Sequence, residues 1–255
     1  MVDANEEGPI LVFLGPTLRL AEAQPVLDAI YLRPAAQGDI LLAAHAFRPR
    51  AMVLIDGQFE DRPAVRHKEI IWAMAQGIVV IGAASMGALR AAELSEFGMI
   101  GVGLVYRWYR RWRLAPDDAV AVLSGPPELG FLPLTDALVD LQRTFASLTR
   151  RNFITAAERD LLTTIARNMN FRERRFEAIL RDAGCREERF KELRKEMARQ
   201  KRLDALLALS SARALVMQEN AGHVSSPWVA TNTFVRDIEA GGIDSTLVNT
   251  YKLNS

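Results

Sequence analysis

The chain has 255 residues, 49% of them hydrophobic and 25% charged, and its formal net charge at pH 7 is +1. This is an ordinary globular composition with room for one large or two small domains, and its near-zero charge excludes a protein that binds polyanions over its whole surface. The single cysteine, Cys185, excludes an internal disulfide framework and a multi-cysteine zinc site. The polar, acidic start is unlike a secretory signal, so we expect a cytoplasmic protein.

The first half of the chain alternates short apolar runs with segments of helical pattern. The apolar runs predict buried strands at residues 10–14, 29–32, 52–55 and 78–81. The segments that follow them predict helices at 20–30, 40–47 (with Asp39 as N-cap), 61–76 and 88–94. A looser strand is expected at 101–105. Strands that alternate with helices predict an α/β fold, with a parallel sheet covered by helices on both faces.

Residues 70–89 form an uncharged run about as long as a membrane span. Glycines at positions 77, 82 and 87 interrupt this run where a helix end, a strand end and a turn would fall. We therefore expect a buried passage of helix, strand and helix there, and no membrane association.

Three loops follow the predicted strands directly: residues 15–17, Asp56-Gly57 and residues 82–87. In a parallel sheet these loops meet at the carboxyl edge, where open α/β folds bind their ligands. Neither G-x-G-x-x-G nor G-x-x-x-x-G-K-[ST] occurs, which disfavours a Rossmann dinucleotide site, a P-loop, and with them a nucleotide-binding module.

The central stretch IVVIGAASMGALRAAE, residues 78–93, predicts a strand, a turn of small residues and a helix that ends by Gly98. Ser85 in this turn could simply cap the helix, and its small neighbours could simply allow close packing of helix on strand. The order Ala83-x-Ser85-x-Gly87 also approximates the nucleophile elbow G-x-S-x-G. A helix start of this kind can hold an anion or a developing oxyanion.

Residues 106–113, YRWYRRWR, interleave aromatic and basic side chains. Such a segment can bind single-stranded nucleic acid, but it is more often a helix with its aromatics inward and its arginines outward, which we expect here. Asp117 and Asp118, after Pro116, could cap a short helix or direct two carboxylates into a cleft.

Helical patterns dominate from residue 132 onward, at 134–148, 156–167, 171–183 and 187–219, and a short helix is expected near 234–239. The sequence thus predicts an α/β domain at 1–130, a helical domain at 131–222 and a polar, adaptable tail at 223–255. Basic residues outnumber acidic ones between 150 and 202, which fits a solvated helix surface or a docking face for an acidic partner.

Four other polar residues allow both a structural and a functional interpretation. His67 could be a core histidine, and Lys68 could extend along Trp72 to reach solvent. Arg90 and Glu93, three residues apart, could form an intrahelical ion pair. Alternatively, an arginine one turn into the helix suits an anionic carboxylate or phosphate.

Several of these motifs together resemble the TfuA-like core domain, over roughly the first half of the chain. They are Asp56-Gly57-x-Phe59, His67-Lys68-Glu69-Ile70, the block from Gly82 to Glu93, Gly98-Met99-x-Gly101-Val102-Gly103 and Asp117-Asp118. The chain departs from the family pattern at Ala119, where glutamate is usual, and at Ser124, where histidine is common.

The resemblance implies a partner of a YcaO-domain enzyme, which activates a peptide amide with ATP. TfuA-like proteins support the installation of backbone thioamides in ribosomal peptides of the trifolitoxin type or in proteins. The activity implied is hydrolysis of a thiocarboxylated ThiS-like carrier protein, which releases sulfide, with improved capture of the peptide substrate as a further role. ATP and Mg would serve the YcaO partner, so this chain itself is expected to need no cofactor or metal.

Thiocarboxylate cleavage needs attack on an acyl carbon and stabilisation of an oxyanion. On this hypothesis Ser85 is the nucleophile or orients a water, His67 is the base and Asp56 orients it. Arg90 would hold the thiocarboxylate. The expected substrate contacts are the oxyanion N–H groups of Met86 and Gly87, together with Thr17, Gly57, Lys68, Glu93, Asp117 and Asp118. The alternative is a non-catalytic adaptor that recruits the peptide to the YcaO enzyme.

Overall fold

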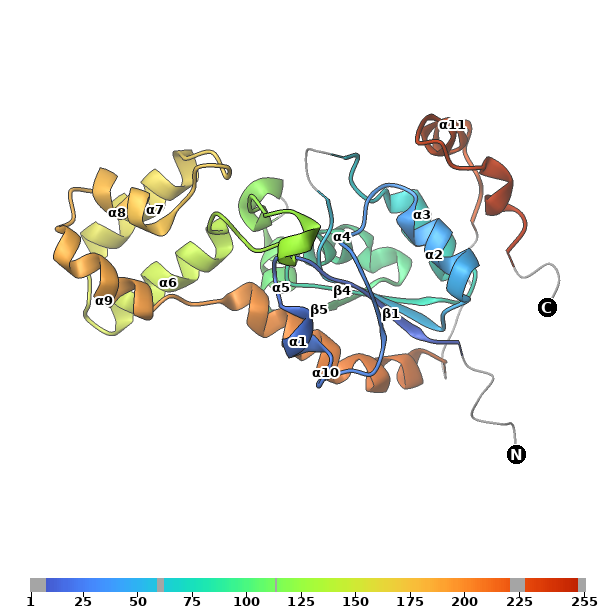
Figure 1. The fold of residues 1–255 in the computed structure, drawn as a ribbon, viewed down its shortest axis with the longest axis horizontal. Helices are drawn as coiled ribbons and strands as arrows, with labels where there is room; N and C mark the ends of the chain where they lie inside the picture. Colours follow the sequence, from blue (N-terminus) through green and yellow to red (C-terminus); the bar gives the residue numbers. More distant parts are fainter. Residues whose placement is uncertain (1–7, 59–61, 113, 221–227, 252–255) are drawn as a thin grey trace.

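The structure is a computed structural model that describes residues 8–58, 62–112, 114–220 and 228–251. Five parallel strands form its sheet in the order β2-β1-β3-β4-β5 (Figure 1). They are β1 (Ile10–Phe13), β2 (Ile30–Leu32), β3 (Ala51–Leu54), β4 (Val79–Ala83) and β5 (Ile100–Val102). This order reverses direction between β1 and β3, as in flavodoxin-like folds, and the predicted α/β class is confirmed.

Helices cover both faces of the sheet. One face packs against α2 (Asp39–Phe47), α3 (His67–Ala75), α4 (Met86–Leu94) and α5 (Gly103–Arg111), and its core includes Leu11, Met52 and Val80. The other face packs against α1 (Leu20–Ala23) and α10 (Gln200–Asn220) around Val12, Val53 and Ile81. Because successive strand residues point to opposite faces, both faces need apolar residues, which explains the continuous apolar runs of the sequence.

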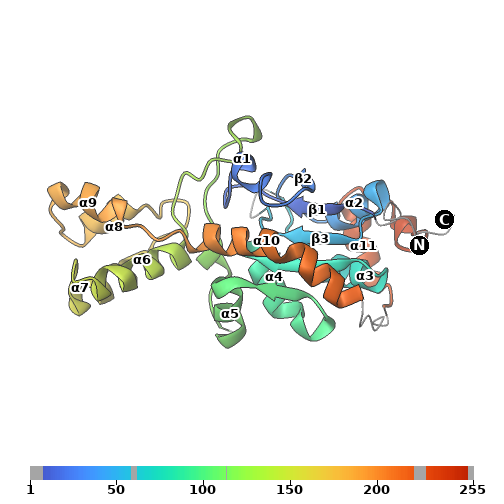
Figure 2. The same ribbon diagram turned by 90° about the horizontal axis from the view of Figure 1, so that it is seen from below.

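The helix α1 is a single turn, much shorter than the helix predicted at 20–30. Gln24 is still helical, but Pro25 follows it and has no N–H with which to continue the helical hydrogen bonds. The surface that α1 leaves uncovered is filled by α10, which lies along the sheet (Figure 2). The sequence groups α10 with the helices of residues 131–222, but the structure makes it a layer of the α/β unit. The domain boundaries stay a prediction.

The other helices of the second half project to one side of the sheet (Figure 1). They are α6 (Leu138–Arg150), α7 (Ala156–Asn168), α8 (Phe176–Asp182) and α9 (Phe190–Lys195). Short 3-10 turns complete the described chain: η1 (Ser95–Phe97), η2 (Asp117–Val120), η3 (Pro127–Leu129), η4 (Glu187–Arg189) and η5 (Ser245–Val248). Among the described residues, no helix has the length and apolar character of a membrane span.

The described part of the C-terminal tail is packed on α2 and α3. The helix α11 (Asn232–Ala240) confirms the helix expected near 234–239, and beyond it the Trp72 Nε1–H donates to the Val248 carbonyl (2.9 Å). The rings of Trp72 and Tyr251 meet edge to face with centroids 5.2 Å apart. Residues 228–251 are therefore part of the packed fold, which differs from the predicted adaptable end. Residues 223–227 and 252–255 lie outside the described residues.

Several predicted bounds differ from the structure. The helix predicted from Asp61 begins at His67, and Asp61 itself is outside the described residues. Asp39 is the first residue of α2 instead of its N-cap, and its carboxylate accepts from the Ala36 N–H (2.8 Å). The strand predicted at 101–105 ends at Val102 because Gly103, with φ +97°, begins α5. This confirms a helix for the basic–aromatic segment, whose Arg113 is not among the described residues.

Glu69 is a buried carboxyl group that joins the starts of two helices. Its side chain accepts hydrogen bonds from the N–H groups of Gly38 (2.9 Å), Ile40 (3.2 Å) and Arg66 (2.7 Å). Burial nevertheless raises the pKa of Glu69 to about 7, although these three N–H groups favour the anion.

This carboxyl group should make stability depend on pH. Its folded-state pKa of about 7 exceeds the unfolded value of 4.5, so its contribution is complete below pH 4.5 and is lost as pH rises to 7. We expect the free energy of unfolding to fall by about 3 kcal/mol from this group over that window. Urea titrations at several pH values should show this slope in the wild type and a flatter one in Glu69→Gln. Equal slopes would contradict the assignment.

Candidate functional site

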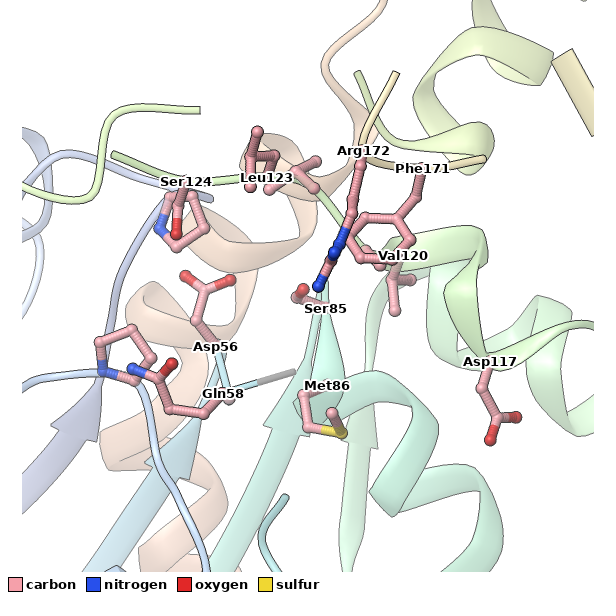
Figure 3. Close-up of a pocket in the computed structure, with 15 residues that line it drawn as sticks. Asp56, Gln58, Ser85, Met86, Asp117, Val120, Leu123, Ser124, Phe171 and Arg172 are labelled. Atoms are coloured by element: carbon pink, nitrogen blue, oxygen red, sulfur yellow. The ribbon is translucent and has the colours of Figure 1, made fainter. Parts of the chain in front are cut away.

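The three predicted loops meet at the carboxyl edge of the sheet, beside the point where the strand order reverses. They line one cavity with η2 and with the loop before α8 (Figure 3). The cavity lining contains Pro16, Pro34, Asp56, Gly57, Gln58, Ser85, Met86, Asp117, Val120, Ala121, Val122, Leu123, Ser124, Phe171 and Arg172. Its volume of about 70 Å³ accommodates a group the size of a carboxylate with a few waters, but not a nucleotide.

Asp56 ties the loop after β1 to the end of β3. Its Oδ2 accepts from the N–H groups of Gly15 (2.9 Å) and Thr17 (3.1 Å), and its Oδ1 accepts from the Thr17 hydroxyl (2.6 Å). The carboxylate is 1% exposed. Because both oxygens are engaged by this loop, Asp56 builds the wall of the cavity and does not orient His67. Thr17 reaches the site only through Asp56.

The turn between β4 and α4 is sharp and strained. Ser85 N–H donates to the Ala83 carbonyl (2.7 Å), which closes a three-residue γ-turn around Ala84. Ala84 has φ +65°, a conformation that alanine rarely adopts, and such strain persists only where the surroundings enforce it. A sharp, strained turn between a strand and a helix is also typical of a nucleophile elbow.

Ser85 occupies the N-cap position of α4, but its side chain accepts no capping hydrogen bond. Its hydroxyl has no hydrogen-bond partner among the described residues, and the residue is 8% exposed at the cavity. The capping role, one of the structural alternatives for this serine, is therefore not observed. What remains is a hydroxyl group presented to the cavity at the start of a helix.

Gly82 and Gly87 allow α4 to lie directly on the sheet. A Cβ atom on Gly87 would overlap the Leu54 carbonyl, and one on Gly82 would overlap the Gly87 carbonyl. The packing explanation for the small residues is therefore correct at these two positions. It also corrects the proposed oxyanion site, because the Gly87 N–H donates to the Ile55 carbonyl (3.2 Å) and is not available to a ligand. The Met86 N–H donates to no described residue.

The predicted His67 base lies elsewhere. His67 Nε2 is 2.8 Å from Glu93 Oε2, and the same oxygen accepts from Arg90 Nη1 (2.7 Å). Burial raises the pKa of Glu93, but the bond to His67 and the charge of Arg90 outweigh it, so the pKa lies below its usual value. Glu93 follows Ser85 by eight residues of helix, about 12 Å along the axis. The predicted triad is therefore not assembled.

Arg90 is also held by contacts within the fold. Its Nε–H donates to the Val65 carbonyl (3.1 Å), and its side chain is 12% exposed in the ion pair with Glu93. It does not line the cavity, so it is wrongly placed for the predicted role of holding the thiocarboxylate. Arg172 is the arginine in the cavity lining, and its guanidinium points toward Ser85 (Figure 3).

The other predicted substrate contacts lie in different places relative to the cavity. Asp117 lies at the edge of the cavity with its carboxylate directed away from Ser85 (Figure 3). Asp118 accepts from Arg174 Nη2 (2.8 Å) and so supports the rim. Lys68 does not line the cavity, and its carbonyl accepts from Trp228 Nε1–H (3.3 Å). Phe59 of the family motif is outside the described residues.

Two buried cations from the helical half hold η2 against the site, and sequence reasoning missed both. Arg174 is 1% exposed and also donates to the carbonyls of Ala166 (3.0 Å) and Met169 (3.0 Å). Lys201 is 4% exposed and donates through Nζ to the Val120 carbonyl (2.7 Å). Burial lowers the pKa of Lys201, while the charge of Asp56 opposes that shift. Lys201 stands at helical spacing from the apolar residues of α10, and this pattern in the sequence indicates that it is buried.

The described residues contain no group of three or more His, Cys, Asp or Glu side chains arranged to hold a metal ion.

Comparison with known proteins supports the resemblance. A family model described as TfuA-like protein matches residues 56–175. The chain therefore carries a TfuA-like domain, and this match extends past the motifs, through α6 and α7 to the loop that holds Arg172 and Arg174. No curated protein sequence matches the chain.

Replacing Asp56 by alanine should loosen the wall of the cavity. The N–H groups of Gly15 and Thr17 would lose their acceptor in a buried site, which should lower the free energy of unfolding by about 3 kcal/mol. Chemical denaturation would measure the change. Asp117→Ala, which removes an exposed carboxylate from the same rim, is the control and should stay within about 0.5 kcal/mol of the wild type. Equal effects would show that the Asp56 bonds are not stabilising.

Proposed function

We propose that this chain is a TfuA-like partner of a YcaO enzyme in backbone thioamidation, and that its cavity cleaves a thiocarboxylated, ThiS-like carrier protein to supply sulfide. The family is associated with YcaO proteins, and the TfuA-like domain of this chain includes the main polar residues of the cavity. The proposal keeps the ribosomal peptide or target protein as the partner's substrate and the cytoplasm as the setting. It assigns ATP and Mg to the YcaO partner and no cofactor to this chain.

The Ser85 hydroxyl carries the proposal. It stands on a strained turn at a helix start, makes no capping bond and opens into a cavity toward which a guanidinium points. A thiocarboxylate is a small anion on an acyl carbon, so Arg172 is the residue suited to bind it. In the first turn of α4, the Met86 N–H has no acceptor among the described residues. It is therefore the backbone donor suited to an oxyanion.

The proposed reaction replaces sulfur by oxygen on the acyl carbon. Ser85, or a water that it orients, attacks the carbon and the C–S bond breaks, releasing hydrosulfide. In the first case, a water then hydrolyses the acyl ester on Ser85. In either case one water is consumed for each thiocarboxylate, and the products are the carrier carboxylate and hydrosulfide.

One observation favours a second candidate, the non-catalytic adaptor. No described histidine or carboxylate bonds to the Ser85 hydroxyl, and both oxygens of Asp56 are engaged by the loop after β1. A cavity without a base in contact with its serine could bind the carrier tail or the peptide and leave the chemistry to the YcaO enzyme. The two candidates differ in whether the purified chain alone releases sulfide.

Ser85→Ala tests the catalytic proposal. With the full chain and a thiocarboxylated ThiS-like carrier, we expect the wild type to release sulfide, and the variant to do so at least about a hundredfold more slowly. Sulfide assay and intact mass of the carrier would measure the reaction, and thermal denaturation would check folding. A folded variant with full activity would remove Ser85 from the chemistry. A wild type that binds the carrier without cleaving it would favour the adaptor.

Arg172→Gln tests the binding of the anion. Loss of the guanidinium should raise the KM for the thiocarboxylated carrier by roughly tenfold or more, since a charge-assisted hydrogen bond is lost. The matched control is Arg175→Gln, an exposed arginine three residues later that does not line the cavity. If both variants behave alike, Arg172 does not bind the substrate.

A further inference from the structure

The helix α5 carries an apolar stripe that the fold leaves partly open. Leu104 and Trp108 are one turn apart on α5, and Trp112, the C-cap residue, lines the same surface with them. Trp112 is 58% exposed, and Leu114 just beyond the helix is fully exposed. Exposed apolar side chains in such a cluster are typical of a surface that binds another molecule.

This stripe forms one wall of a groove whose other wall is α6. Val139, Gln142 and Ala146 of α6 face it, and Gln200 at the start of α10 also lines it. The groove consists of two adjoining hollows of about 520 and 800 Å³. Both hollows are lined by Trp108, Arg111, Trp112 and Gln142. The groove shares no residue with the cavity at Ser85.

The groove is positively charged. Arg107, Arg111, Arg143 and Arg167 line it, and none of them forms an ion pair with a described residue. Asp118 is the acidic residue in the described lining, and its carboxylate is already paired with Arg174. Four arginines therefore border an apolar surface without described acidic partners.

We infer that the groove between α5 and α6 is a docking site for an acidic, amphipathic helix of a partner protein. Apolar side chains on one side of such a helix would cover the Leu104–Trp112 stripe, and its flanking carboxylates would reach the arginines. The stripe spans eight residues, about 12 Å, which matches two turns of a bound helix. This inference goes beyond the proposed reaction and does not depend on it.

The structure disfavours other occupants. Base stacking needs an open ring face, but Trp108 is only partly exposed, and the Arg111 guanidinium lies over the Trp112 ring (5.7 Å). A second copy docked symmetrically would bring two sets of arginines together, which like-charge repulsion opposes. An acidic helix satisfies both the charge and the apolar surface.

Selection from a displayed library of random helical peptides on the full chain tests the inference. We expect enriched peptides to carry large apolar residues at i, i+4 and i+7 with aspartate or glutamate beside them. Fluorescence anisotropy of an enriched peptide should show binding that weakens roughly tenfold or more in Arg107→Glu/Arg143→Glu and in Trp112→Ser. All three changed residues are exposed, so these variants should melt like the wild type.

Two controls make the same kinds of change outside the groove. Arg213→Glu and Leu161→Ser alter exposed residues of α10 and α7 and should leave the peptide affinity unchanged. Enriched peptides without this pattern, or with equal affinity for the groove variants, would overturn the inference. So would groove-dependent binding of oligothymidylate or of phosphatidylglycerol vesicles in place of peptides. A dimer in sedimentation that the groove variants dissociate would also overturn it.

Discussion

The close approach of α4 to strands β3 and β4 determines the geometry of the site. Gly82 and Gly87 permit it, because a Cβ atom at either position would overlap a backbone carbonyl. With the helix this near the sheet, the chain has to reverse within a single γ-turn, and Ala84 takes a positive φ. The buried surroundings hold that strain, and as a consequence Ser85 faces the cavity instead of capping its helix.

The helical half of the chain completes this site. Arg174 and Lys201 bring η2 over the carboxyl edge of the sheet by donating to its backbone and to Asp118. Buried cations are stable only when their donors are satisfied, and here main-chain carbonyls and acidic side chains supply the acceptors. The loop before α8 then contributes Arg172 to the cavity. Arg172 is the arginine in the described lining of the cavity, so the guanidinium comes from the helical half of the chain.

The arginines of this protein differ in function because they differ in burial and partners. Arg174 is buried and structural, Arg90 is held by Glu93 and Val65, and Arg172 points into the cavity. The arginines around the α5–α6 groove have no described ion-pair partner and lie beside exposed apolar side chains. An anion in the cavity and an acidic helix in the groove would therefore be recognised at separate places.

The sequence by itself determined the strands, most of the helices, and the gathering of three loops at one edge of a parallel sheet. These follow from local apolar periodicity, from turn residues such as Gly98, and from the rule that parallel strands end on the same side. It also identified Ser85 as the residue of the turn and the TfuA-like motifs around it. Lys201 also stands at helical spacing from the apolar residues of α10, which is a pattern that indicates a buried position.

Only the tertiary structure decided which groups meet. Whether His67 faces Asp56 or Glu93 depends on where α3 begins and how it is rotated against α4. Whether the Gly87 N–H is available depends on its distance from the carbonyl of Ile55, which directly follows β3. Arg172 enters the site from a segment far along the chain. Such pairings are set by helix rotation and long-range packing, for which local spacing carries no information.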